Sequence, residues 1–339
     1  MPSTFSKEDF INEFVGALSI LSLAESEGIK AAENEYDRLV FVACGAPYQM
    51  MRSIHYWTDK YAVSTDVRVF HAGEIVHLNP AFLNERTIVF LGSHSGTTRE
   101  VIEAAEFLKS KACKTFAFTQ QADSALGKKV DQVFPYGRST QGYFSSLMLT
   151  LAFTSGFLKE REKEWDFHED LMKSLPNFPG TLAAAKSEWQ EKGHTDADVL
   201  KGADSIYFIG SGPTFTTAYI FAACFLMEMQ WMRAFTLSAA EFFHGPFEVF
   251  DKETSVVLLL GEDFSRPEAE RVLKFCRDYL SEPIIYDSRE FAMPGIHDKI
   301  RPMLAPFILD SAMTNIVESL AELNNHPLTT RRYMGKVDY

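Results

Sequence analysis

Short apolar runs alternate with amphipathic segments along the first half of the chain. The runs span residues 38–44, 67–70, 87–92, 115–119 and 130–134. Continuous apolar runs of this length are typical of strands that are buried on both faces of a sheet. Residues 48–61 and 99–111, between them, have the spacing of helices. This alternation predicts a parallel sheet with helices on both faces, which is an α/β architecture.

Two further apolar stretches predict long helices. Residues 6–32 place Phe10, Phe14, Leu18 and Leu21 at helical spacing, and residues 139–160 form a second such stretch. A face of this kind must pack on something. It packs either on its own domain or on a second subunit. We expect a homodimer or a larger homo-oligomer, in which these helices could form the interface.

The second half of the chain repeats the first. The string LVFVACGA at 39–46 aligns with IYFIGSGP at 206–213, and Glu74 aligns with Glu241, both at an offset of 167 residues. Two matches at one offset indicate a tandem duplication. We therefore predict an N-terminal helix over residues 1–34 and two domains, 35–192 and 193–339, each a parallel five-stranded α/β/α sandwich of flavodoxin-like type. The second domain ends in a C-terminal tail. Glu74 and Glu241 are assigned structural roles at the domain junction.

The hexapeptide from Ser93 to Thr98, SHSGTT, follows one predicted strand and precedes a predicted helix. Hydroxyls and backbone N–H groups at a helix N-terminus form an anion site, most naturally for a phosphate. Gly96 lets the backbone approach such a ligand. The alternative is a simple helix cap, which needs only one hydroxyl. The second copy carries Glu262 and Asp263 at the corresponding place, so only the first copy is expected to bind an anion.

Glu228 is the one carboxylate in the apolar segment FLMEMQWM, and His244 follows sixteen residues later in a Phe-Phe-His-Gly-Pro turn. A carboxylate in apolar surroundings has a raised pKa, which makes it a better base. A histidine in a loop titrates near neutrality. From the residues alone two interpretations stay open, because Glu228 serves either as a base or as the partner of an arginine from another segment.

Composition limits the possible partners and compartments. The net charge of −13 argues against nucleic acid and against anionic membranes as partners. The four cysteines show no CxxC spacing, and the N-terminus lacks the pattern of a signal peptide, so we expect a cytoplasmic protein with reduced thiols. The histidines lack metal-ligand spacing, so neither a metal nor a cofactor is expected.

These motifs together resemble the sugar isomerase (SIS) domain family. The hexapeptide from Ser93 is similar to the family's Ser-x-Ser-Gly-x-Thr phosphosugar loop. Glu228, His244 and Lys336 match the glutamate, histidine and lysine of the isomerase half of glucosamine-6-phosphate synthase. The strings MEMQW, EFFHGPFE and HPLTTRRYMGKVDY resemble a bacterial subgroup, the deglycases of 6-phosphorylated fructoselysine, glucoselysine or fructose-aspartate adducts.

The resemblance implies a role for each matched residue. Glu228 would carry a proton between C1 and C2 of the sugar, His244 would assist ring opening, and Lys336 would contact open-chain oxygens. The expected substrate-binding residues lie after the first strand, in the hexapeptide from Ser93 and in the C-terminal tail. They are Cys44, Gly45, Ser93, Ser95, Gly96, Thr98, Arg331 and Arg332. The last two are candidates for a carboxylate of the amino acid, or they belong to a solvated basic tail.

The expected activity is therefore release of a hexose 6-phosphate and a free amino acid from a small-molecule adduct. An isomerase or deaminase of sugar phosphates uses the same base and acid and is the alternative. A non-catalytic sugar-phosphate sensor is a further alternative, against which the pairing of Glu228 with His244 argues. In the resembling enzymes a neighbouring subunit completes the site, often through the histidine loop.

Overall fold

The structure is a computed structural model that describes residues 5–34 and 36–338. Residues 1–4, 35 and 339, which the predicted domain limits include, lie outside the described residues. The chain forms two compact units, of which the first comprises Ser6–Pro179 and Gly295–Ile300. The second comprises Gly180–Pro294 and the chain from Arg301 onward, with Phe5. The predicted boundary after residue 192 falls inside helix α10 (Gln190–Leu200), which belongs to the second unit.

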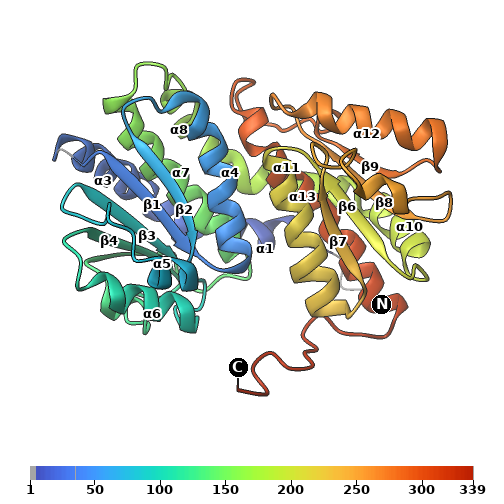
Figure 1. Ribbon diagram of the computed structural model, residues 1–339, viewed down its shortest axis with the longest axis horizontal. Helices are drawn as coiled ribbons and strands as arrows, with labels where there is room; N and C mark the ends of the chain where they lie inside the picture. The colour runs from blue at the N-terminus through green and yellow to red at the C-terminus, as the bar shows by residue number, and fades with distance from the viewer. Residues whose placement is uncertain (1–4, 35, 339) are drawn as a thin grey trace. The chain divides into compact units, whose positions relative to one another are not determined.

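The first unit is built on a five-stranded parallel sheet of the predicted kind (Figure 1). Its strands are β1 (Arg38–Ala43), β2 (Asp66–His71), β3 (Thr87–Gly92), β4 (Lys114–Thr119) and β5 (Gln132–Pro135). They are ordered β2-β1-β3-β4-β5, and all neighbours pair in parallel. Because β1 and β3 are central, their carboxyl ends lie side by side at one edge of the sheet.

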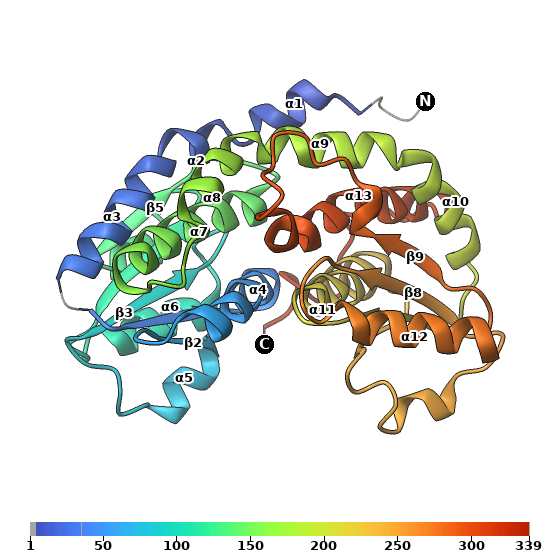
Figure 2. The same ribbon diagram turned by 90° about the horizontal axis from the view of Figure 1, so that it is seen from above.

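Helices cover both faces of this sheet (Figure 2). After the N-terminal segment, the helices of the unit are α4 (Gly45–Tyr61), α5 (Ala72–Leu78), α6 (Arg99–Leu108), η1 (Gly127–Lys129), α7 (Gly142–Arg161), α8 (His168–Ser174) and η2 (Leu175–Asn177). Val40 and Val89 pack with α5 and α6 on one face. Phe90 and Phe116 point to the other face, where their rings meet Phe153 of α7 at 4.5 and 5.2 Å between centroids. Alternate residues of one apolar strand thus enter two different cores.

The N-terminal segment is helical but broken, whereas one helix was predicted over residues 6–32. It forms α1 (Lys7–Asn12), α2 (Val15–Ser19) and α3 (Leu21–Glu33). Phe14, at the first break, is fully buried and contacts the ring of Phe144. Helix α3 packs so closely on α7 that a Cβ on Gly28 would lie 2.1 Å from the carbonyl oxygen of Phe153. This apolar face therefore packs on its own unit, which is one of the two interpretations of the sequence.

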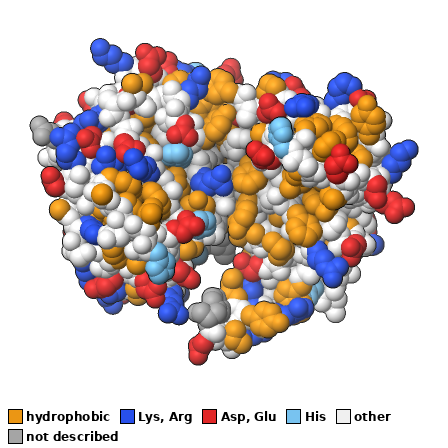
Figure 3. Space-filling view, in the orientation of Figure 1, with side chains coloured by type: hydrophobic (Ala, Val, Ile, Leu, Met, Phe, Trp, Pro, Cys, Tyr) orange, Lys and Arg blue, Asp and Glu red, His pale blue; other side chains and the backbone are white. Residues whose placement is uncertain are grey.

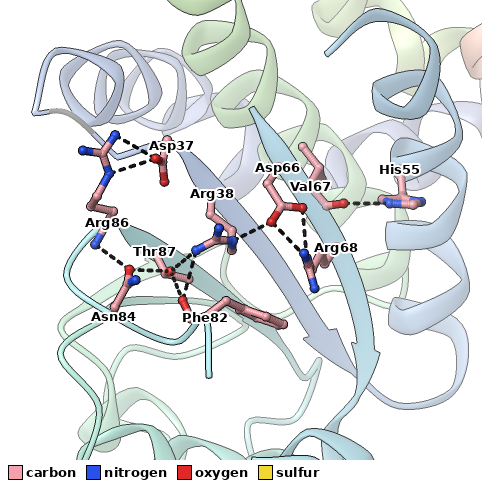
Figure 4. A network of polar contacts seen from close by, with 10 residues as sticks. All are labelled: Asp37, Arg38, His55, Asp66, Val67, Arg68, Phe82, Asn84, Arg86 and Thr87. Atoms are coloured by element: carbon pink, nitrogen blue, oxygen red, sulfur yellow. Dashed lines mark hydrogen bonds and ion pairs between the residues drawn. The ribbon is translucent and has the colours of Figure 1, made fainter. Parts of the chain in front are cut away.

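A polar network joins the amino ends of β1, β2 and β3 (Figure 4). Arg38 Nε donates to Asp66 Oδ2 at 2.6 Å, and Arg68 Nε donates to the same carboxylate at 2.9 Å. Burial raises the pKa of Asp66, but the hydrogen bonds from Arg68 and Arg38 outweigh this effect, so the pKa is lowered. The network lies at the opposite end of the strands from the Ser93 loop and holds the sheet in register.

The second unit contains a parallel sheet of four strands, so the prediction of five strands in each domain is wrong for this one. The strands are β6 (Ile206–Gly210), β7 (Ala234–Ser238), β8 (Ser255–Leu260) and β9 (Ile284–Asp287), in the order β7-β6-β8-β9. This order repeats that of β2-β1-β3-β4. After β9 the chain turns, because Met293 and Gly295 adopt φ values of 47° and 79° on either side of Pro294. A residue in this conformation cannot extend a strand.

The second sheet is also covered on both faces (Figure 2). Its remaining elements are α9 (Phe178–Glu188), α11 (Pro213–Tyr219), η3 (Ile220–Gln230), η4 (Pro246–Val249), α12 (Arg266–Tyr279), η5 (Ser288–Glu290) and α13 (Arg301–Leu323). Helix α12 packs through Val272 and Cys276 on Leu258 and Leu260 of β8. Helix α13 is long and mostly buried. In the described part of the chain, no helix combines the length and the apolar character that a bilayer crossing needs.

Candidate functional site

Glu228 lies near the end of η3, which is an eleven-residue stretch of π-helix. A π-helix has hydrogen bonds from residue i to i+5, is rare, and occurs frequently at functional sites. Glu228 lines a cavity of about 620 Å³ within the second unit. The lining residues come from η3, from the chain that follows it and from the C-terminal tail, and they are Ala223, Met227, Glu228, Trp231, Met232, Arg233, Arg331, Arg332, Tyr333 and Met334.

An arginine of the tail is paired with Glu228. Arg331 Nη2 lies 2.8 Å from Glu228 Oε1, and both side chains are more than three-quarters shielded from solvent. Burial raises the pKa of Glu228, and the charge and hydrogen bond of Arg331 lower it, with burial the larger effect. The carboxyl therefore titrates above its usual range although it has a cationic partner. Of the two interpretations of the sequence, the structure shows the pairing of Glu228 with an arginine. The raised pKa of its shielded carboxyl is the property that the other interpretation, a base, requires.

The tail is folded around Arg331. Arg331 Nη1 donates to the carbonyl oxygens of Leu328 and Thr330 at 2.7 and 3.0 Å. Lys336 Nζ donates to the carbonyl oxygen of Arg331 at 2.5 Å. The structure therefore brings Lys336 next to the arginine that holds Glu228, although the lysine does not line the cavity.

Trp231 ends the π-helix in an unusual conformation. Its φ of 56° is in the left-handed region, which a bulky residue adopts only under strain. His326 holds it there, because the two rings meet edge to face at 4.5 Å and Gln230 Nε2 donates to the His326 carbonyl oxygen at 2.9 Å. The guanidinium of Arg332 lies over the indole, 4.3 Å from the ring centroid. No pattern in the sequence indicates this stacked pair.

His244 is in an exposed turn of the second unit and is not among the residues that line the cavity. Its backbone N–H donates to the Glu241 carbonyl oxygen at 3.0 Å, and Gly245 beside it has a φ of 119°. The turn packs through Phe242 on the core under β8. Within one chain, the structure does not bring His244 into the cavity with Glu228.

The predicted phosphosugar loop lies at the carboxyl end of β3. Ser93 is buried, and its Oγ lies 2.8 Å from Thr98 Oγ1 and accepts from the Gly96 N–H at 3.1 Å. Gly96 has a φ of 66°, and a Cβ there would lie 2.4 Å from Ser124. Thr98 is the N-cap of α6 but makes no side-chain hydrogen bond to the helix, and Ser95 is exposed. The loop thus places hydroxyls at the N-terminus of α6, an arrangement that suits an anion.

His94, a residue of this loop for which the sequence indicated no role, anchors the loop to other parts of the unit. His94 Nδ1 lies 2.7 Å from the Tyr136 hydroxyl, and its Nε2 lies 2.6 Å from Gln120 Nε2. Burial lowers the pKa of His94 and raises the pKa of Tyr136 to about 12. A neutral imidazole bonded at both nitrogens fixes the loop without adding charge. The signal in the sequence was a histidine between two loop serines, but its partners are distant in the chain.

Cys44 and Gly45 join β1 to α4 and belong to the same unit as the loop. Burial raises the pKa of the Cys44 thiol, an effect opposed by hydrogen bonds from the backbone of Ala72 and Gly73. The thiol is therefore protonated at neutral pH. Gly45 has a φ of 60° and open space around its Cα, so its backbone is accessible to a ligand. Glu74, in the first turn of α5, and Glu241 are both exposed.

The corresponding loop of the second unit is closed by its own ion pairs. Glu262 is paired with Arg301 at 3.0 Å, and Asp263 accepts from the Ser265 N–H at 2.9 Å. Arg266 donates to the Gly261 carbonyl oxygen at 2.7 Å and binds both oxygens of Asp287. The carboxylates and arginines of this loop are thus paired with each other and with the backbone. Among the described residues, no group of three acidic, histidine or cysteine side chains is arranged to hold a metal ion.

Comparisons with known proteins agree with this fold and these motifs. The model of the SIS domain matches residues 34–158. Fructosamine deglycase FrlB from Bacillus subtilis (strain 168) is 32% identical over 89% of this chain and 93% of its own length. The agropine synthesis conjugase of Rhizobium rhizogenes is 30% identical over 100% of this chain and 97% of its own. Fructoselysine 6-phosphate deglycase from Escherichia coli (strain K12) is 28% identical over 89% of this chain and 87% of its own.

The fold gives the same assignment. A solved structure from Bacillus subtilis, provisionally described as a phosphosugar isomerase, has a TM-score of 0.85 and 30% identity, and the match covers 94% of this chain and 100% of that one. The fold and the family match define a protein of the SIS-domain class. The chain belongs to the SIS-domain family that includes the fructosamine and fructoselysine 6-phosphate deglycases.

Proposed function

We propose that the protein is a deglycase that converts a 6-phosphorylated sugar–amino acid adduct to a hexose 6-phosphate and a free amino acid. The observation that carries the proposal is Glu228, a shielded carboxylate of raised pKa that lines a cavity large enough for the amine part of such an adduct. The deglycase relatives are similar over about nine-tenths of the chain and support the same class of substrate.

The chemistry needs one base and one water molecule. In a 1-amino-1-deoxy-2-ketose, the Glu228 carboxylate takes a proton from C1, and the electron pair of that C–H bond forms a C1=C2 bond. The π pair of the C2 carbonyl moves to its oxygen, which takes a proton from water, and the product is an enaminol. Return of a proton to C2 leaves an imine between C1 and nitrogen. Water adds to C1, the C1–N bond breaks and the amine leaves, so the products are an aldose 6-phosphate and an amino acid. A raised pKa suits this task because a stronger base removes the proton more readily.

The remaining site residues have supporting parts in the proposal. Ser93, Ser95, Gly96 and Thr98 would hold the 6-phosphate with hydroxyls and N–H groups, and Cys44 and Gly45 would contact the sugar with backbone groups. Lys336 would stabilise open-chain oxygens. His244 would act on the ring oxygen during ring opening, and because it does not line the cavity of its own chain, we propose that a second copy of the chain supplies it.

A second candidate is the joining of an amino acid to a sugar. It is favoured by one observation, the similarity to an agropine synthesis conjugase over the whole chain. The same proton transfer between C1 and C2 serves both directions, so Glu228 would have the same role. The direction of the reaction then depends on the substrates that the protein binds.

The test is incubation with the 6-phosphates of fructoselysine, glucoselysine and fructose-aspartate, with assays for hexose 6-phosphate and free amino acid. We expect equal amounts of the two products from at least one adduct. Turnover of none of them would contradict the deglycase proposal. Formation of an adduct from a sugar and an amino acid, without the cleavage, would favour the second candidate.

A further inference from the structure

The cavity around Glu228 has more cationic than anionic groups. Three arginines and one glutamate line it, in a chain whose net charge is −13. Arg331 is committed to Glu228, and Arg233 donates to Asp204 at 2.9 Å. Arg332 is different, because in residues 5–34 and 36–338 no carboxylate pairs with it. An unpaired guanidinium at a cavity wall is suited to an anionic group of a ligand.

The guanidinium of Arg332 is also held in place. It stacks on Trp231, and Trp231 is fixed in a strained conformation by its contact with His326. Strain of this kind persists only where the surrounding structure enforces it, and it is concentrated at ligand sites. Stacking leaves the edge of the guanidinium free to donate two parallel hydrogen bonds, the geometry that a carboxylate accepts. The space-filling view shows hydrophobic and basic side chains side by side along the tail (Figure 3).

The chemistry places the amino acid near this arginine. The nitrogen of the adduct is bonded to C1, the carbon from which Glu228 takes a proton, so the substituent on nitrogen lies within a few bonds of Glu228. Arg332 lines the same cavity as Glu228, and apolar side chains, among them Met227 and Met232, line it as well. A carboxylate attached one carbon away from that nitrogen is close enough to be a ligand of the cavity.

We propose that Arg332, stacked on Trp231, binds the carboxylate of the amino acid, and that the protein acts on adducts in which this carboxylate stands next to the glycated nitrogen. The inference rests on the proposed function and adds the class of amine that is released. An adduct through the α-nitrogen holds its carboxylate one carbon away from the glycated nitrogen and carries no second ammonium on that carbon. An adduct through the side-chain nitrogen of lysine brings an α-ammonium, which the arginines of the cavity repel.

The test compares two substrates that differ only in the carboxylate, the 6-phosphates of fructose-glycine and fructose-methylamine. A charge-assisted hydrogen bond contributes about 1.5–3 kcal/mol, so kcat/KM for the glycine adduct should be on the order of 10- to 100-fold higher. Arg332→Gln should remove this preference, because it should lower kcat/KM for the glycine adduct much more than for the methylamine adduct. Arg332→Lys, which keeps the charge without the planar fork, should retain part of the preference. Arg233→Gln, which alters another arginine of the cavity, is the matched control and should keep the preference.

The outcomes separate the two proposals. Turnover of both adducts with no preference, or an equal loss on both with Arg332→Gln, would overturn the role of Arg332 and leave the deglycase function intact. Turnover of neither adduct by the unmodified protein would overturn the proposed function and this inference with it. A preference for the lysine adduct linked through its side chain over the glycine adduct would overturn the assignment of the α-nitrogen.

Discussion

Arg331 Nη2 lies 2.8 Å from Glu228 Oε1, so a residue of the C-terminal tail is paired with the carboxylate at the centre of the candidate site. Burial raises the pKa of Glu228 and Arg331 lowers it, and the first effect is the larger. The tail therefore moderates the basicity of the acid. A base must be ionised to accept a proton, and a partner that favours the ionised form extends its activity to lower pH.

Removal of the guanidinium should shift the pH profile. In Arg331→Met only burial acts on Glu228, so its pKa rises further and the acidic limb of kcat/KM moves to higher pH. Arg331→Lys keeps a positive charge and should show a smaller shift. The measurement is kcat/KM against pH for the three proteins, with thermal unfolding as a check on folding. An acidic limb at the same pH in Arg331→Met would show that the ion pair does not set the basicity of the site.

Gly96 provides a test of the phosphosugar loop. In Gly96→Ala the alanine would have to adopt a φ of 66°, and its Cβ would lie 2.4 Å from the side chain of Ser124. The loop must therefore move. We expect a loss of about 1–3 kcal/mol in the free energy of unfolding and weaker binding of hexose 6-phosphates. Binding is measured by titration calorimetry and stability by denaturant unfolding.

Gly73→Ala is the matched control for this substitution. Gly73 lies in helix α5 with open space around it, so alanine there should be neutral or slightly stabilising. Unchanged phosphate binding in Gly96→Ala, beside an equally unaffected control, would show that the loop does not hold the ligand.

Asp310 should make stability fall as pH rises. It is buried in α13, and burial raises its pKa to about 8. Between about pH 4 and pH 8 the unfolded chain releases the proton and the folded chain keeps it, so the free energy of unfolding decreases by up to about 1.4 kcal/mol per pH unit. Asp310→Asn cannot ionise and should gain stability relative to the unmodified protein from pH 5 to pH 8. Parallel stability curves for the two proteins would contradict this.

The first unit could be predicted well from the sequence because its strands are continuous apolar runs. Val40 and Phe41 face different cores, which is why the run shows no alternation and reads as a doubly buried parallel strand. The breaks in the N-terminal helix could not be predicted, because Phe14 is buried by Phe144, a partner far away in the chain. The second sheet has no fifth strand because the chain turns at Pro294. The prediction of five strands came from the similarity between the two repeats, which does not extend to this segment.

The sequence indicates the separate parts of the candidate site and not the contacts between them. Glu228 and the Ser93 loop are visible as local patterns, a lone acid in an apolar segment and a cluster of hydroxyls after a strand. The pairing of Glu228 with Arg331 joins residues about a hundred positions apart, and the π-helix that carries Glu228 has no signature in the hydrophobic spacing. Arg331 and Arg332 are adjacent in sequence and were given one role, whereas the structure pairs the first with Glu228 and stacks the second on Trp231.

The central claim is that Glu228 moves a proton from C1 of the adduct before the amine leaves. Its most direct test is turnover of a fructose–amino acid 6-phosphate that carries two deuterium atoms at C1, with the product identified by NMR and mass spectrometry. The account predicts an aldose 6-phosphate with a single deuterium at C1, and no product from Glu228→Gln although it still binds the phosphosugar. A product that retains both deuterium atoms at C1, or an active Glu228→Gln protein, would contradict it.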